Sequence, residues 1–405
     1  MRLFGRDGIS RRRFLAGSAA ATAVTAASLA LSGCGEGKEV KVASGQPQVV
    51  DDASQIIDVL DEYKDAELSI AQAGEWSLPL GTLLFHCEGS WSAAMMTPES
   101  AASPNSIGVL SLANGSLLTL IGSPTLGRAY SFFDVRASSG VFSWVEIEYA
   151  TLSWTLLARS FADGSLSGDA VELDHGDSDW EPPHFTCTGS SVIWQKMPST
   201  SGSKTSEKSH CYRWSVGDGS SNEEIWESLG RFATSPRVSE GVLTIVPRVL
   251  NEEGTYYGMT AVDLSSPKFT KLDQLVLPAG VRPFEAVYMG DSFVFSIEAS
   301  YDGVGSLGNM GTFIGREGGP YAYLSREPAA CVAGKGTRYL MKTRASHCLI
   351  DTAEQTYALL ACPDRALDYG DYPASEGVTD TFVTYAAVKD DQGVPSSVTA
   401  RAFTL

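Results

Sequence analysis

Four arginines stand just before runs of β-forming residues and are candidates for binding an anionic ligand: Arg128, Arg231, Arg282 and Arg326. Trp180 and Asp371 occupy the corresponding positions in two further units of the sequence. If these segments meet at one end of neighbouring sheets, the guanidinium groups form a ring that attracts a carboxylate or a sugar acid. The alternative is that each arginine pairs with a nearby acidic residue and stabilises the fold.

The other residue patterns indicate no catalytic, metal or cofactor site. The acidic segment 174–179 offers oxygen ligands but lacks the spacing of a calcium-binding loop. The glycines of 303–308 match a dinucleotide-binding string, but they lie between expected strands and open no helix. The five histidines are scattered, and neither a Gly-x-Ser-x-Gly nor a His-Glu-x-x-His string occurs. We therefore expect no metal and no cofactor, and we assign no catalytic residue.

The cysteines suggest one disulfide bond. Cys348 and Cys362 are symmetric about a turn near Gln355, so they can face each other on paired strands. We predict a cross-strand bridge between these two and free thiols elsewhere in the domain.

The elements that must position these residues repeat along the chain. Glycines recur at intervals of 51, 49, 52, 49, 46 and 41 residues, each followed by a β-rich run: Gly89, Gly140, Gly189, Gly241, Gly290, Gly336 and Gly377. In most units a second hairpin follows, with turns such as Asn114-Gly115 and Asp163-Gly164. Two hairpins in each unit are typical of a four-stranded antiparallel propeller blade.

We therefore predict an all-β fold, a seven-bladed β-propeller over residues 67–405. Residues 68–80 would supply the missing strand of the last blade and close the ring. Six or eight blades stay open, and a pair of β-sandwiches is the rival fold. In strand order and blade length the units resemble the TolB-like and WD40-like propellers of bacterial envelopes, over about residues 68–405. This resemblance implies an architecture and no particular activity.

The first 33 residues have the features of an export signal. Arg11 and Arg12 lie in a basic start, Phe14 and Leu15 open an apolar run, and small residues lead to Cys34. The basic string resembles the twin-arginine signal, and Leu-Ser-Gly-Cys resembles the lipobox of bacterial lipoproteins. This resemblance implies that residues 1–33 are removed and that Cys34 carries the lipid. An uncleaved membrane-spanning helix is the alternative.

The resemblance places the protein at the cell membrane, anchored by lipid on the extracytoplasmic side. Residues 34–49 would form a polar tether. Residues 50–66 have apolar residues at helical spacing and predict a short helix before the propeller.

The charge balance limits the partners. The chain has 30 basic and 48 acidic residues, a net charge of −18. Without residues 1–33, which hold five arginines and one aspartate, the excess of acidic residues rises to 22. This charge argues against nucleic acid and anionic lipid head groups as partners.

We expect a lipid-anchored propeller that binds an anionic small molecule or an envelope protein without catalysis. One alternative is a propeller enzyme, a hydrolase or lyase of glycans or peptides. Another is a structural subunit of an envelope complex.

Overall fold

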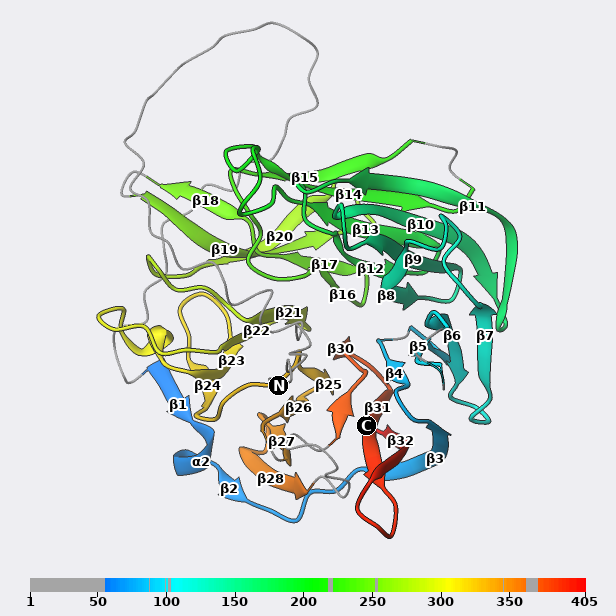
Figure 1. Ribbon diagram of the computed structural model, residues 1–405. Coiled ribbons are helices and arrows are strands. Elements are labelled where there is room, and N and C mark those ends of the chain that lie inside the picture. The colour runs from blue at the N-terminus through cyan, green and yellow to red at the C-terminus, as the bar shows by residue number, and fades with distance from the viewer. Residues whose placement is uncertain are drawn as a thin grey trace, which may run out of the picture.

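The computed structural model describes residues 55–405 except 87, 99, 101–102, 218–220, 252–253, 345 and 362–370. Within these residues the chain forms antiparallel sheets arranged around a common axis, as in a β-propeller (Figure 1). The first strand of each blade lies toward the centre, and the later strands lie progressively further out. No helix in the described part of the chain is long and apolar enough to cross a bilayer.

Three blades form the first half of the ring. The first contains β4 (Leu83–Leu84), β5 (Trp91–Met96), β6 (Ser106–Ser111) and β7 (Leu117–Ile121). The second contains β8 (Ser131–Ala137), β9 (Val141–Glu148), β10 (Ser153–Ala162) and β11 (Ser165–Gly176). The third contains β12 (His184–Thr188), β13 (Ser191–Lys196), β14 (Ser209–Ser215) and β15 (Glu223–Ser228).

Three further blades continue the ring. The fourth contains β16 (Arg237–Ser239), β17 (Val242–Ile245), β18 (Arg248–Asn251), β19 (Gly254–Asp263) and β20 (Thr270–Val276). The fifth contains β21 (Glu285–Met289), β22 (Ser292–Ile297), the 3₁₀ turn η2 (Ser306–Gly308), β23 (Gly311–Gly315) and β24 (Tyr321–Leu324). The sixth contains β25 (Ala333–Lys335), β26 (Arg338–Lys342), β27 (Ser346–Asp351) and β28 (Thr356–Ala361).

A composite sheet, here called the closing sheet, takes strands from both ends of the described chain. It contains β29 (Tyr372–Pro373), β31 (Thr381–Lys389), β32 (Pro395–Thr404) and β3 (Ala71–Pro79). β3 pairs antiparallel with β32 along its whole length, from Ala71 opposite Thr404 to Pro79 opposite Ser397. The segment expected to close the ring does so.

The prediction of seven like, four-stranded antiparallel blades is wrong. Six of the repeating glycines lie between the first and second strands of a blade, as expected. Gly377 lies between β29 and β31 of the closing sheet but differs from the others, because it belongs to β30 (Gly377–Val378), which pairs in parallel with β25 of the sixth blade. We therefore count six blades built on the repeat, and the closing sheet completes the circle. A glycine marks a turn in the sequence, but it does not specify which strand its neighbours pair with.

The predicted helix over residues 50–66 is also wrong in extent. β1 (Ile56–Asp58) pairs in parallel with β24, and β2 (Lys64–Asp65) pairs in parallel with β28. Between them lies a single helical turn, α2 (Val59–Glu62), whose first turn is capped by Asp58 accepting a hydrogen bond from the Leu60 amide at 3.0 Å. Residues 56–65, here called the strap, therefore add outer strands to the fifth and sixth blades.

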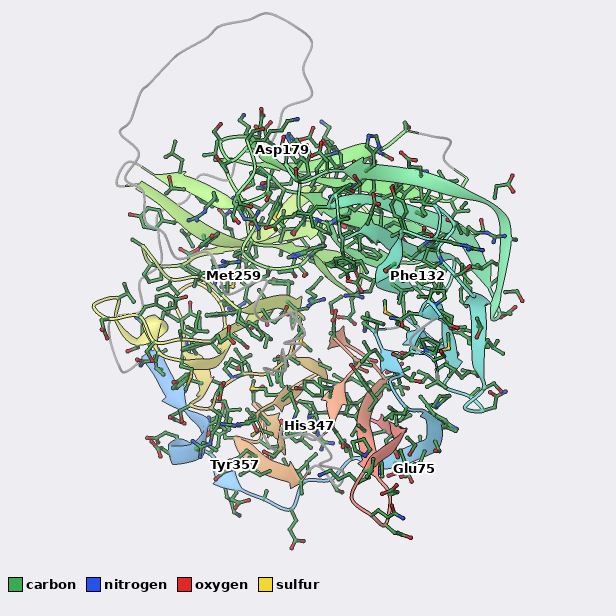
Figure 2. The ribbon with its side chains drawn as sticks, viewed as in Figure 1. Glu75, Phe132, Asp179, Met259, His347 and Tyr357 are labelled. Carbon is green, nitrogen blue, oxygen red and sulfur yellow. The ribbon has the colours of Figure 1, made fainter. Side chains whose placement is uncertain are left out.

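Apolar side chains fill the spaces between neighbouring sheets (Figure 2). One cluster joins Ala93 and Ile107 of the first blade to Phe132 and Trp144 of the second. Each blade is covered on both faces, so inner strands such as β9 are buried along most of their length. This packing fixes the first strands around the axis, where their polar side chains can meet.

Candidate functional site

Polar side chains from the innermost strands meet at the axis, and Arg237 at the start of β16 is the centre of this group. Its Nη2 lies 2.9 Å from Glu285 Oε2, and its Nη1 lies 2.8 Å from Glu376 Oε2. A second contact, at 3.0 Å to Glu285 Oε1, makes the first pair bidentate. Arg237 is 8% exposed, whereas the carboxylates of Glu285 and Glu376 are 19% and 21% exposed. The two carboxylates are thus held in place and still reach solvent.

The two carboxyl groups differ in acidity. Burial raises the pKa of Glu285 above its ordinary value, and the attraction of Arg237 only partly opposes this. Burial also acts to raise the pKa of Glu376, but the attraction of Arg237 and Arg136 opposes it, and this pKa is lowered. Pairs of carboxyl groups whose pKa values are driven apart are suited to serve as acid and base. Here and below, we call Arg237, Glu285, Glu376 and His86 the axial cluster.

His86 completes this cluster from the first blade. Its Nδ1 accepts a hydrogen bond from the Glu376 amide at 3.1 Å, so the ring proton lies on Nε2. Burial lowers the pKa of His86, although the charge of Glu376 acts in the opposite direction. A neutral imidazole therefore stands beside Glu376, and its Nε2 can donate a hydrogen bond.

A second ion pair lies beside the cluster. Arg136 Nη1 is 2.5 Å from Asp134 Oδ1, and the guanidinium carbon lies 4.8 Å from the ring centre of Phe85. Burial raises the pKa of the Cys187 thiol, which is 4% exposed. Cys187 is therefore protonated and unsuited to act as a nucleophile.

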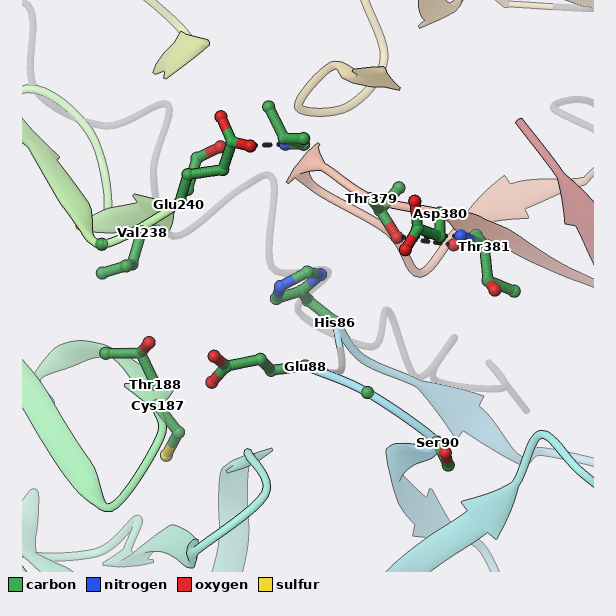
Figure 3. Close-up of a pocket in the computed structure, with 14 residues that line it drawn as sticks. His86, Glu88, Ser90, Cys187, Thr188, Val238, Glu240, Thr379, Asp380 and Thr381 are labelled. Atoms are coloured by element: carbon green, nitrogen blue, oxygen red, sulfur yellow. Dashed lines mark hydrogen bonds between the residues drawn. The ribbon is translucent and has the colours of Figure 1, made fainter. Parts of the chain in front are cut away.

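A cavity of about 440 Å³ opens above the cluster, at the end of the ring that carries the turns between first and second strands. His86 and Glu88 project into it from one side, and Thr188 faces them (Figure 3). The rest of its lining is mostly polar and includes Ser90, Ser239, Glu240, Thr379, Asp380 and Thr381. Of the axial cluster, His86 lines this cavity, and it joins the cavity to Glu376 through the hydrogen bond from the Glu376 amide.

The sequence-predicted arginines lie toward the other end of the inner strands. Arg231 pairs with Glu181 and donates a hydrogen bond to the Pro198 carbonyl oxygen. Arg282 donates to the Ala233 carbonyl oxygen at 3.2 Å. Arg326 donates to the carbonyl oxygen of its neighbour Ser325, and Arg128 is exposed. Among the described residues, no contact joins any two of these four arginines, so the structure does not bring them together.

The other predicted residues are placed as follows. Trp180 lies under two ammonium groups, with Lys196 Nζ and Lys204 Nζ at 5.2 and 5.0 Å from its ring centre. Asp371 is buried and accepts a hydrogen bond from Arg401 Nη1 at 3.3 Å. Cys348 is buried opposite Leu359.

The remaining predicted positions lie outside the described residues. They are Cys362, Cys34, Arg11, Arg12, Phe14 and Leu15. The disulfide between Cys348 and Cys362, the lipid at Cys34 and the export signal therefore stay predictions.

The axial cluster was missed at the sequence level, although a signal for it exists. Polar or charged residues precede several of the repeating glycines by three to five positions, as His86, Arg136, Arg237 and Glu285 do. Arg136, Arg237 and Glu285 belong to the first strand of their blades, which faces the axis, and His86 follows β4 by two residues. A charged residue on an otherwise apolar inner strand is therefore the pattern that indicates this site.

No protein-family model and no curated protein matches the chain. Among solved structures, puromycin hydrolase aligns with 86% of this chain and 54% of its own, at 14% identity and a TM-score of 0.51. The β-propeller domain of the Trilobed protease from Pyrococcus furiosus aligns with 64% of this chain and 79% of its own, at 12% identity and a TM-score of 0.43. Oligogalacturonate lyase from Vibrio parahaemolyticus aligns with 82% of this chain and 98% of its own, at 10% identity and a TM-score of 0.43.

The chain spans about half the length of puromycin hydrolase, and at this identity the likeness shows the fold alone. The prediction of a propeller that binds an anionic ligand without catalysis is nevertheless wrong, because the described residues do not show the arrangement on which it was based. It depended on arginines that converge, and the groups that do converge are a single arginine, two glutamates and a histidine. We conclude that the chain is a β-propeller, similar in fold to a solved hydrolase.

Proposed function

We propose that this propeller is an enzyme that hydrolyses glycosidic bonds by general acid–base catalysis at the axial cluster. One observation carries the proposal: a single guanidinium, that of Arg237, holds two carboxyl groups whose pKa values are shifted in opposite directions. Two carboxyl groups, one protonated and one ionised, are the usual means of cleaving a glycosidic bond.

Each group has a defined part in the reaction. Glu285, whose raised pKa allows it to take up a proton in mildly acidic solution, donates this proton to the glycosidic oxygen as the bond to the anomeric carbon breaks. Glu376, ionised, accepts a proton from the water molecule that attacks the anomeric carbon. The products are two sugars with new hydroxyl groups, and solvent returns the proton from Glu376 to Glu285. Arg237 keeps both carboxyl groups in position, and His86 Nε2 donates a hydrogen bond to the bound sugar.

The cavity supports this proposal through its lining. Hydroxyl side chains of Ser90, Thr188, Thr379 and Thr381 surround its opening. Such groups both donate and accept hydrogen bonds, as sugar hydroxyls do. A volume of about 440 Å³ lies within the range of cavities that hold small ligands.

We also propose that the enzyme acts outside the cytoplasm, anchored by a lipid on Cys34. The support is the sequence of residues 10–34, with its basic start, apolar run and small residues before the cysteine. The substrate would then be a glycan of the cell envelope or of the surroundings.

The direct test incubates the purified protein with a panel of oligosaccharides and peptides and measures new reducing ends and new amino termini. We expect new reducing ends from at least one oligosaccharide, and their loss in Glu285→Gln. The matched control is Glu207→Gln, because Glu207 is an exposed glutamate in the loop after β13. A panel in which no oligosaccharide is cleaved, or in which only peptides are cleaved, would overturn the proposal.

A further inference from the structure

The cavity above the axial cluster has an acidic rim. Glu88, Glu240 and Asp380 line it, and none of the described lining residues is a lysine or arginine. The Glu88 carboxylate accepts a hydrogen bond from the Gly189 amide at 2.5 Å. The Glu88 side chain thus extends from the first blade across the opening of the cavity to the third blade (Figure 3). Asp380 is paired with Lys335 at 2.7 Å, but its side chain is 84% exposed, so solvent weakens that pair.

The cations below the rim are already engaged by carboxylates. Arg237 is shared by Glu285 and Glu376, and Arg136 is paired with Asp134. His86 is neutral, because burial lowers its pKa. No unpaired positive group in the described part of the cavity is therefore left to receive an anionic ligand.

The charge of the whole protein strengthens this local field. The chain carries a net charge of −18, and a cavity with one sign of charge concentrates ions of the opposite sign. A protonated amine that enters the cavity would form charge-assisted hydrogen bonds with the rim carboxylates. A sugar acid would meet repulsion from the same groups. The cavity therefore favours a cationic ligand, whereas the sequence predicted an anionic ligand at the other end of the ring, where the four arginines lie.

We infer that the substrate is a cationic glycan whose sugars carry free amino groups. The inference rests on the proposed hydrolysis and specifies which glycans the site selects. Glu88 and Glu240 bind the ammonium groups and keep the chain over the axial cluster. Removal of these carboxylates should weaken binding of the substrate more than it slows cleavage.

The experiment compares two oligosaccharides of equal length that differ only in their amino groups, which are free in one and acetylated in the other. Rates are measured at mildly acidic pH, where the amines are charged, and at two salt concentrations. For the wild-type protein we expect a lower KM with the free amines, and a KM that rises with salt because the attraction is screened. The acetylated compound should show no such salt dependence.

The variants test the role of the rim. In Glu88→Gln/Glu240→Gln we expect KM for the free-amine compound to rise by roughly tenfold with little change in kcat, the pattern of lost ground-state binding. Glu240→Gln alone keeps the contact of Glu88 with Gly189 and should show part of the effect, so a folding defect cannot produce the result. Glu207→Gln should behave as wild type.

The outcomes separate this inference from the proposed function. Equal KM values for the two compounds, or no effect of the double variant, would refute the charge selection while leaving glycoside hydrolysis in place. If neither compound is cleaved, hydrolysis fails, and calorimetric binding of the free-amine compound decides the inference independently. If the wild-type protein binds the free-amine compound and the double variant binds it more weakly, the inference holds. If both proteins bind the compound equally, or neither binds it, the inference is overturned.

Discussion

Arg237 and Glu376 are 139 residues apart in the sequence and meet at the axis, with Nη1 of the arginine 2.8 Å from Oε2 of the glutamate. The same guanidinium holds Glu285, which lies 48 residues away from Arg237. With His86 of the first blade, four separate parts of the ring therefore contribute to the axial cluster, and its geometry requires these parts to be packed together. Folding of the ring and assembly of the proposed active site are the same event.

Glu285→Gln should lower kcat by about 10²–10⁴-fold, because the amide cannot give a proton to the leaving oxygen. The amide has nearly the shape of the carboxyl group but offers Arg237 one acceptor oxygen where the carboxylate offers two, so the melting temperature should fall only modestly. Initial rates and thermal unfolding of the same preparation check both statements. Wild-type activity in this variant would remove Glu285 from the mechanism.

The rate should depend on pH through both carboxyl groups. Glu376 must be ionised, and its pKa is lowered below the ordinary 4.5, so the acidic limb of kcat/KM lies below pH 4.5. Glu285 must be protonated, and its pKa is raised above 4.5, so the basic limb lies above pH 4.5. A bell-shaped profile of kcat/KM with its maximum between the two limbs is expected. A rate that keeps rising toward neutral pH would contradict the assigned roles.

Arg237→Met should destabilise the protein by about 3–5 kcal/mol, because it leaves two buried carboxyl groups without their partner. Arg237→Lys should be intermediate, since an ammonium cannot make the bidentate contact with Glu285. Urea unfolding gives the free energies, and the second substitution Glu285→Gln should restore part of the loss in the Met variant. Unchanged stability of Arg237→Met would show that the cluster contributes nothing to the closed ring.

The sequence was informative about local turns and poor on long-range pairing. The glycines before β-rich runs predicted the turns of the six blades, because a positive φ at such a residue favours glycine, as at Gly241 and Gly290. The same reasoning failed at Gly377, whose strand pairs with the sixth blade. Hydrogen bonding between distant segments depends on the three-dimensional position of the strands, which local sequence does not record.

The functional site, too, was only partly predictable from the sequence. Arg231 was noticed because it precedes an inner strand, but its partner Glu181 could not be identified from spacing. Arg237 was overlooked, although it lies only six residues further along. Its role depends on Glu285 and Glu376, which come from other sheets, so only the assembled ring shows it.

Val59→Ala tests the strap. Val59 is fully buried among side chains of the fifth and sixth blades, so its loss should cost on the order of 2 kcal/mol of unfolding free energy. Lys64→Ala is the control, because Lys64 is exposed on β2. Chemical unfolding of both variants measures the difference. Equal stability of the two would show that the strap packs only weakly against the ring.

Cys34→Ser should move the protein from the membrane fraction to the soluble fraction, because a serine cannot take the thioether-linked lipid. Fractionation and immunoblotting of cells that express either form check this. Arg11→Lys/Arg12→Lys should instead retain the full-length precursor inside the cell, since the paired arginines of the export signal are lost. Membrane retention of the Cys34→Ser protein would argue against lipid anchoring.

The strap divides the circumference of the ring into two unlike arcs. β1 and β2 cover the outer edges of β24 and β28, and β3 forms the edge of the closing sheet. The edges at β7, β11, β15 and β20 have no such cover among the described residues. An uncovered edge strand presents backbone groups that can pair with a strand of another molecule. β1 and β2 are themselves outermost strands, but they are only 3 and 2 residues long, whereas β3, β7, β11, β15 and β20 are longer. Side-to-side assembly, or misassembly, of this protein should therefore begin at one of these longer edges and not at the strap.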